Sequence, residues 1–162
     1  MASAELELLS EGLTFTGVHA SSARGLFEWL GHELSQRGLI RGTWLDAIGE
    51  RERNYPTGLQ FPNIGVAIPH TDPENIERPY IAVVRLDEPV VFRSISADEP
   101  PVEASLVVNL GIVHSEGQVR VLQLLMLTLA DEETAADIMA QSTPKELYET
   151  LIRHMELIDA TL

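Results

Sequence analysis

Apolar residues follow two spacings along this chain, and each spacing predicts a different kind of element. Segments with alternating or continuous apolar residues, rich in β-branched side chains, indicate strands. Residues 104–113 are almost wholly apolar, which is typical of a central strand covered on both faces. We predict strands over residues 13–19, 65–68, 81–86, 90–92 and 104–113.

Apolar residues three and four positions apart predict amphipathic helices before and after these strands. In the first helix, Leu26, Leu30 and Leu34 share one face, and Ser22 and Gly38 are its predicted caps. Serine or threonine followed three residues later by an acid or glutamine predicts capping boxes at 43–46, 115–118 and 143–146. The predicted helices cover residues 23–36, 43–53, 119–130, 132–141 and 144–157.

Glycine, proline and asparagine mark the connections between the predicted elements. Residues 54–63 and 93–101 are predicted to be loops, and residues 72–75 and 87–89 to be turns. No repeat or linker divides the chain. The sequence therefore predicts one α/β domain over residues 1–162, with a mixed sheet sandwiched between helices.

Charge and composition restrict the class of partner. The 162 residues include 25 acidic and 11 basic side chains, which gives a formal net charge of −14. Such a surface repels nucleic acid and should attract a basic protein, although solubility alone also explains the charge. The chain has no cysteine, which excludes disulfides and thiolate chemistry. We expect a cytoplasmic protein without membrane insertion, because we find neither a signal peptide nor the roughly 20-residue apolar run of a membrane span.

The stretch with the clearest chemical potential is GVAIPHTD at residues 65–72. Pro69 ends the predicted strand, because proline has no N–H to donate to a sheet. His70 follows at the strand exit, where α/β proteins usually place their chemistry. Such a histidine can act as a nucleophile, a general base or a metal ligand, or can be simply a polar residue at a strand end.

The four other histidines offer weaker candidates. His19, His32 and His154 are interpreted as structural or surface residues. His114 also follows a strand and could lie near His70 if the two strands are neighbours, but a loop position without a role is the better explanation.

Metal and cofactor chemistry have little support in the sequence. His70 and Asp72 could bind zinc or manganese, but no third ligand is evident. Phosphate-binding loops, dinucleotide fingerprints and hydrolase signatures are missing. We therefore expect neither a metal nor a cofactor, and a metal-dependent hydrolase that uses His70 and Asp72 is kept as an alternative.

Two arginines, Arg51 and Arg53, end the second predicted helix just before the stretch that contains His70. Positive charge at a helix C-terminus is favoured by the helix dipole, which is one explanation. Arginine is also the side chain best shaped to bind a phosphoryl group.

The motif RExxYPTGL at 51–59, followed by GVAIPHTD at 65–72, resembles the enzyme IIA component of the bacterial phosphoenolpyruvate-dependent sugar phosphotransferase system. The resemblance is to the fructose–mannitol class, and most of all to its galactitol-type branch. It extends over nearly the whole chain, and it implies the family's mixed five-stranded sheet between helices.

The resemblance also implies a phosphotransferase activity with a phosphohistidine intermediate. The family histidine falls on His70, which would accept a phosphoryl group from the histidine-containing phosphocarrier protein. It would pass the group to a cysteine of the IIB component, which serves a membrane IIC component in the uptake of galactitol or a related polyol or pentose.

Two further positions follow from the resemblance. The family arginine falls on Arg51, whereas Arg53 is a nearby positive charge without a match. Mannitol and fructose members carry a second active-site histidine at the start of the long buried helix, where this chain has Gln118. Gln118 either contacts the phosphoryl group or only closes its capping box with Ser115.

Two other readings belong to different functional classes. A regulatory module of the same fold would also be phosphorylated on His70 but would signal by binding a sensor or a transcription factor. A non-catalytic acidic scaffold would use only the charge of the surface.

Overall fold

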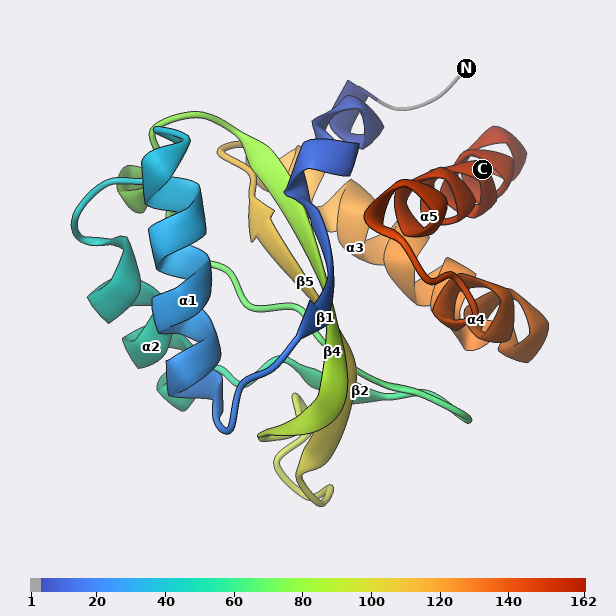
Figure 1. Cartoon of the computed structure of the whole chain (residues 1–162), viewed down its shortest axis with the longest axis horizontal. Coiled ribbons are helices and arrows are strands. Elements are labelled where there is room, and N and C mark those ends of the chain that lie inside the picture. The colour runs from blue at the N-terminus through green and yellow to red at the C-terminus, as the bar shows by residue number, and fades with distance from the viewer. Residues whose placement is uncertain (1–3) are drawn as a thin grey trace.

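The computed structural model of the protein describes residues 4–162. Its five strands form one sheet in the order β1–β4–β5–β3–β2 (Figure 1). The strands are β1 (Thr14–Val18), β2 (Gly58–Gln60), β3 (Gly65–Ala67), β4 (Tyr80–Phe92) and β5 (Val102–Gly111). The β1–β4 and β3–β5 pairs are parallel, whereas β4–β5 and β2–β3 are antiparallel. The predicted mixed sheet is thus confirmed.

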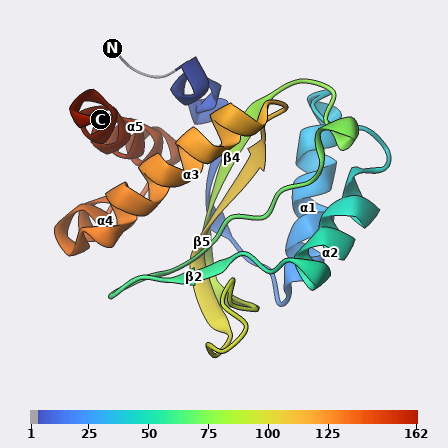
Figure 2. The same cartoon turned by 180° about the vertical axis from the view of Figure 1, so that it is seen from behind.

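Helices cover both faces of this sheet. They are α1 (Ala23–Gln36), α2 (Trp44–Asn54), α3 (Ser115–Ala130), α4 (Glu132–Met139) and α5 (Pro144–Thr161), with short 3-10 helices η1 (Ala4–Leu8), η2 (Glu11–Leu13) and η3 (Pro73–Asn75). The first two α-helices lie on one face, and α3, α4 and α5 lie on the other (Figure 2). Within residues 4–162, none of these helices is both long and apolar enough to cross a bilayer.

The central strand β5 contributes to the core on both faces, as its apolar sequence predicts. Leu106 and Val108 pack into the cluster beneath α3 and α5, whereas Val107 packs against α1 and α2. All three side chains are fully buried. Burial on both faces makes β5 the rigid frame beside which the next strand, β3, is placed.

Local capping signals were predicted correctly at two helices. The hydroxyl of Ser22 accepts a hydrogen bond from the Gly25 N–H at 3.0 Å, and Thr143 does the same for Glu146 at 3.2 Å. Gly38 has a φ of +69°, the left-handed conformation that ends α1. Each of these signals depends only on neighbours in the sequence.

The capping boxes predicted at residues 43–46 and 115–118 are wrong. Thr43 has a helical backbone, and its hydroxyl donates to Asn75 Oδ1 at 2.7 Å instead of capping α2. Ser115 is already the first residue of α3, which therefore begins four residues before the predicted start at 119. Gln118 consequently lies inside the first turn and does not close a box with Ser115.

Two strands also differ from the prediction. Residues 87–89 do not form a turn between two strands, because β4 continues through them with a shift of register between Arg85 and Val90. Pro89 falls within this shift, where a strand can accommodate a residue that has no N–H. The predicted loop 54–63 contains β2, whose three residues pair with β3.

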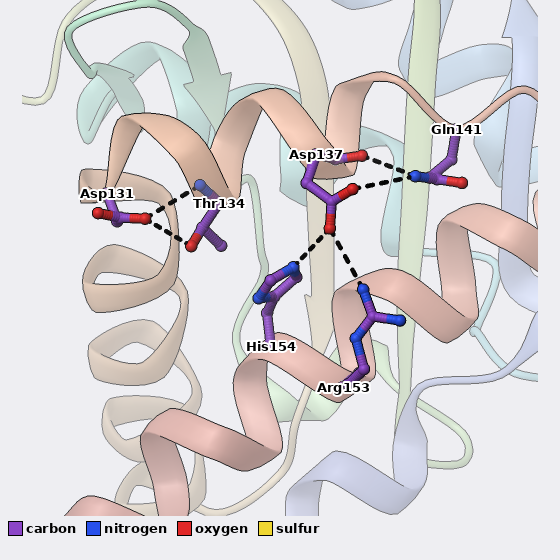
Figure 3. Close-up of polar contacts among 6 residues, drawn as sticks. All are labelled: Asp131, Thr134, Asp137, Gln141, Arg153 and His154. Atoms are coloured by element: carbon purple, nitrogen blue, oxygen red, sulfur yellow. Dashed lines mark hydrogen bonds and ion pairs between the residues drawn. The ribbon is translucent and has the colours of Figure 1, made fainter.

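Helices α4 and α5 are joined by polar contacts around Asp137 (Figure 3). Its carboxylate accepts hydrogen bonds from His154 Nε2 at 2.8 Å and from Arg153 at 3.2 Å. The hydrogen bond from His154 is the main reason that the pKa of Asp137 lies below its usual value. His154 is half-buried, so its helix face is less exposed than predicted. Its hydrogen bond to Asp137 is structural, as the sequence indicated.

Candidate functional site

The backbone before His70 is fixed by the central strand. The carbonyl of the buried Pro69 accepts hydrogen bonds from Asn109 Nδ2 at 2.9 Å and from the Leu110 N–H at 3.3 Å. His70 itself forms an isolated parallel bridge with Leu110. The residue therefore leaves β3 at a defined position and does not belong to a free loop.

The imidazole ring of His70 is oriented by its own segment. Its Nδ1 lies 2.9 Å from the carbonyl oxygen of Ile68. Because a carbonyl can only accept, this contact assigns the hydrogen of the neutral ring to Nδ1. The lone pair of Nε2 is then available for chemistry.

The surroundings of His70 also favour the uncharged form of the ring. Partial burial lowers its pKa, and the nearby Arg51 guanidinium acts in the same direction. The Ile68 carbonyl and the Asp72 carboxylate oppose this shift, but the net direction is downward from 6.5. At neutral pH the ring is uncharged and can act as a nucleophile.

Arg51 lies in the last turn of α2 and faces the segment that follows His70. Its Nη1 donates to Asp72 Oδ1 at 3.2 Å, and its guanidinium carbon lies 5.4 Å from the centre of the Tyr55 ring. Its Nε is buried and has no hydrogen-bond partner among residues 4–162. The guanidinium thus places a positive charge near His70, and no other described residue accepts the hydrogen of its buried Nε.

A polar depression of about 370 Å³ surrounds this arginine. It is lined by Thr43, Ala47, Glu50, Arg51, Asn54, Tyr55, Asp72, Glu74 and Asn75. The space lies between the end of α2 and the turn after His70, so an anionic group near Arg51 would be open to solvent and to a partner protein.

Asp72 binds Arg51 through its carboxylate, a contact that the sequence did not reveal. Its side chain is two-thirds exposed. Among residues 4–162, no three histidine, aspartate or glutamate side chains are grouped in a way that could hold a metal ion.

Gln118 lies in the first turn of α3, and its side chain is half-buried. Its N–H donates to the His114 carbonyl at 3.1 Å, but its side chain makes no hydrogen bond with another described residue. Because β3 and β5 are parallel, their C-terminal ends lie at the same end of the sheet. His70 and the start of α3 both follow these ends. No hydrogen bond joins Gln118 to His70 in the part of the chain that the structure describes.

The remaining sequence candidates stay outside this arrangement. His19, His32 and His114 are exposed and make no side-chain hydrogen bond within the described residues, so His114 is not paired with His70. Arg53 is exposed, and its carbonyl accepts a hydrogen bond from Arg93. Of the positive charges predicted here, only Arg51 faces the segment around His70.

Comparison with known protein families identifies the family to which the chain belongs. The family model described as "Phosphoenolpyruvate-dependent sugar phosphotransferase system, EIIA 2" matches residues 7–154. The chain belongs to this family. The match includes both motifs of the candidate site, 51–59 and 65–72, and extends over all five strands.

Individual members of the family resemble parts or all of the chain. The galactitol-specific EIIA component of Escherichia coli K12 is 29% identical over 96 residues, which cover 59% of this chain and 63% of that protein. The chain thus aligns with somewhat less than two thirds of the length of that curated relative.

Solved structures of the family share the fold. The mannitol enzyme IIA in complex with phosphorylated IIB from Escherichia coli has a TM-score of 0.71 and 22% identity, and the match covers 88% of this chain and 96% of that one. The nitrogen regulatory protein IIA-Ntr from Neisseria meningitidis has a TM-score of 0.69 and 24% identity, with 92% and 99% covered. At these identities the likeness shows the fold alone.

Proposed function

We propose that the protein is a phosphoryl carrier in which Nε2 of His70 holds the group between two partner proteins. The observation that carries this proposal is the contact between Nδ1 and the Ile68 carbonyl at 2.9 Å. It leaves Nε2 as the single basic nitrogen of a ring whose pKa is lowered toward the neutral form. A neutral imidazole with a free lone pair is the nucleophile that phosphoryl transfer requires.

Transfer of the phosphoryl group into and out of the site needs no cofactor. The lone pair of Nε2 attacks the phosphorus atom of a phosphohistidine on the donor, and the P–N bond of the donor breaks as the new one forms. A cysteine thiolate of the acceptor then attacks the same phosphorus, and His70 recovers its lone pair. The hydrogen on Nδ1 stays in place throughout, bonded to the Ile68 carbonyl.

Arg51 and Gln118 are proposed to stabilise the phosphoryl group. The positive charge of Arg51 at the solvent-open depression supports its role, because transfer of this kind depends mainly on positioning and charge stabilisation. Gln118 is the second candidate, since its unbonded amide lies at the N-terminal end of α3, which favours an anion. Substitution of Gln118 by alanine should then slow phosphoryl acceptance without affecting His70 itself.

The partners are proposed by analogy with the relatives. We take the donor to be the histidine-containing phosphocarrier protein and the acceptor a IIB component that serves a membrane IIC component. The mannitol enzyme bound to phosphorylated IIB supports the acceptor, and the net charge of −14 suits a basic donor. The galactitol-specific relative supports galactitol or a related polyol as the sugar, with the carrier in the cytoplasm.

A regulatory role of the same phosphorylated histidine is the second candidate. It is supported by the match to the nitrogen regulatory protein, which covers 99% of that chain. The two roles differ in the next step, because only a transport component hands its phosphoryl group to a IIB cysteine.

Intact-mass spectrometry tests the proposal. The protein is incubated with phosphoenolpyruvate, enzyme I and the phosphocarrier protein, and we expect the gain of one acid-labile phosphate. His70→Ala should gain none, whereas His114→Ala, which removes an exposed histidine after the neighbouring strand, should gain it normally. Phosphorylation of the His70→Ala variant would refute the assignment. Transfer onward to a cognate IIB protein would separate transport from regulation.

A further inference from the structure

A largely buried carboxylate, Glu52, lies under the turn that leads to the histidine strand. Its Oε2 accepts the Thr57 N–H at 2.7 Å, and its Oε1 accepts the Thr57 hydroxyl at 2.9 Å. The single hydrogen of this hydroxyl is therefore directed at Glu52. The lone pairs of Oγ1 are left to accept another bond.

That bond comes from the histidine strand. The Ile68 N–H donates to Thr57 Oγ1 at 3.2 Å, in addition to a longer contact of 3.4 Å with the Thr57 carbonyl. The carbonyl of the same residue, Ile68, accepts from His70 Nδ1 at 2.9 Å. Three consecutive hydrogen bonds thus connect Glu52 to the imidazole ring.

We propose that Glu52 is a positioning residue for phosphoryl acceptance, which acts through Thr57 and Ile68 to keep His70 in the tautomer with Nε2 free. The inference rests on the proposed function. Glu52 does not touch the reacting atoms. Its carboxylate fixes the direction of the Thr57 hydroxyl, and Oγ1 of that hydroxyl holds the N–H of Ile68, the residue whose carbonyl orients the ring.

The surroundings of Glu52 agree with this role. Burial raises its pKa, while both hydrogen bonds from Thr57 and the charges of Arg93 and Arg51 oppose the rise. A buried carboxylate is unfavourable unless hydrogen bonds satisfy it, and here Thr57 supplies two. A neutral residue could close the same turn, but only an acceptor of both bonds imposes a single direction on the hydroxyl.

The matched variants are Thr57→Val and Thr57→Ser in the full chain. Valine keeps the shape and removes the hydroxyl, whereas serine keeps the hydroxyl. Long-range ¹H–¹⁵N correlation spectra of the ring report the tautomer of His70 directly. We expect wild type and Thr57→Ser to hold the Nδ1–H form, and Thr57→Val to show a mixture of both forms and to accept phosphate about tenfold to 100-fold more slowly.

Glu52→Gln provides a second test that does not depend on the folding of the valine variant. The amide would donate to Thr57 Oγ1, so the hydroxyl hydrogen would have to turn elsewhere, and we expect the same mixture of tautomers. Asp46→Asn removes an exposed carboxylate from the same helix and should change neither reading.

Folded Thr57→Val and Glu52→Gln proteins that keep the pure Nδ1–H form and wild-type rates would overturn the proposal. Because the tautomer is measured without any donor, its result is independent of phosphoryl transfer. A wild-type protein that accepts no phosphate would count against the proposed function, while a tautomer shift in the variants would still support the role of Glu52.

Discussion

Arg51 and Asp72 form an ion pair that links the end of α2 to the turn after His70, with Nη1 and Oδ1 3.2 Å apart. The pair is solvent-exposed, with 35% and 66% of the two side chains accessible, so its own contribution to stability is small. Its position is more important than its strength. The carboxylate of Asp72 occupies one donor of the guanidinium until a phosphoryl group arrives.

Substitution of Arg51 by alanine should slow phosphoryl acceptance by about 100-fold, the usual cost of removing one donor that stabilises developing charge. The rate of mass gain under limiting phosphocarrier measures this loss. Arg53→Ala provides the matched control, since its exposed side chain ends the same helix without facing His70. Equal rates in the two variants would remove Arg51 from the site.

Substitution of Asp72 by asparagine, unlike that of Arg51 by alanine, should not slow phosphoryl acceptance. It removes the one charge that raises the pKa of His70, so that pKa should fall further in the variant. It also frees Arg51 and removes a negative charge next to the incoming group, so phosphoryl acceptance should be at least as fast as in wild type. NMR titration of the ring checks the first effect. A slower variant would mean that the ion pair, and not the free arginine, is the active arrangement.

The lowered pKa of His70 predicts a pH-dependent stability. Above pH 6.5, the usual pKa, the ring is neutral in both the folded and unfolded chains and adds no pH dependence. Below it, the unfolded chain binds a proton first, so the free energy of unfolding decreases until the folded pKa is reached. Relative to His70→Gln, wild type should therefore lose stability only on the acid side. Urea titrations across this range test it, and a constant difference between the two proteins would contradict it.

Asn109 supports the site from the centre of the sheet. Its side chain is fully buried, donates to the Pro69 carbonyl at 2.9 Å and accepts from the Tyr80 hydroxyl at 2.6 Å. Burial of that hydroxyl also raises the pKa of Tyr80. Asn109→Ala leaves the Tyr80 hydroxyl without its acceptor, removes one of the two hydrogen bonds to the Pro69 carbonyl and leaves a cavity, so it should cost about 2–4 kcal/mol of unfolding free energy.

A urea titration of Asn109→Ala at neutral pH measures this loss. The Asn109→Ala, Tyr80→Phe double variant separates the two bonds, since it removes the stranded hydroxyl as well. Retention of full stability in the single variant would show that water replaces the amide.

The sequence predicted what depends on neighbouring residues. The bounds of α1 follow from Leu26, Leu30 and Leu34 together with the Ser22 cap, all within one short segment. The strand exit at His70 follows from Pro69 in the same way. Physical rules of local geometry suffice for such features.

Other features depend on residues far apart and left no local signal. The β2 strand has three residues, and a Cβ at Gly58 would come within 2.6 Å of the carbonyl of Arg93, the residue that follows β4. The bond from Asn109 to Pro69 spans 40 positions. The direction of the Thr57 hydroxyl depends on which oxygen of which neighbour accepts it, and no residue pattern encodes that.

The same distance of 40 positions has a consequence during synthesis on the ribosome. Arg51, His70 and Asp72 leave the exit tunnel well before Asn109 and Leu110, which fix the peptide next to the histidine. Until β5 has emerged and paired with β3, the nascent chain exposes the histidine without its frame. The segment around His70 gains its full frame only after residues 102–111 have emerged, so we expect the site to form once synthesis has passed β5.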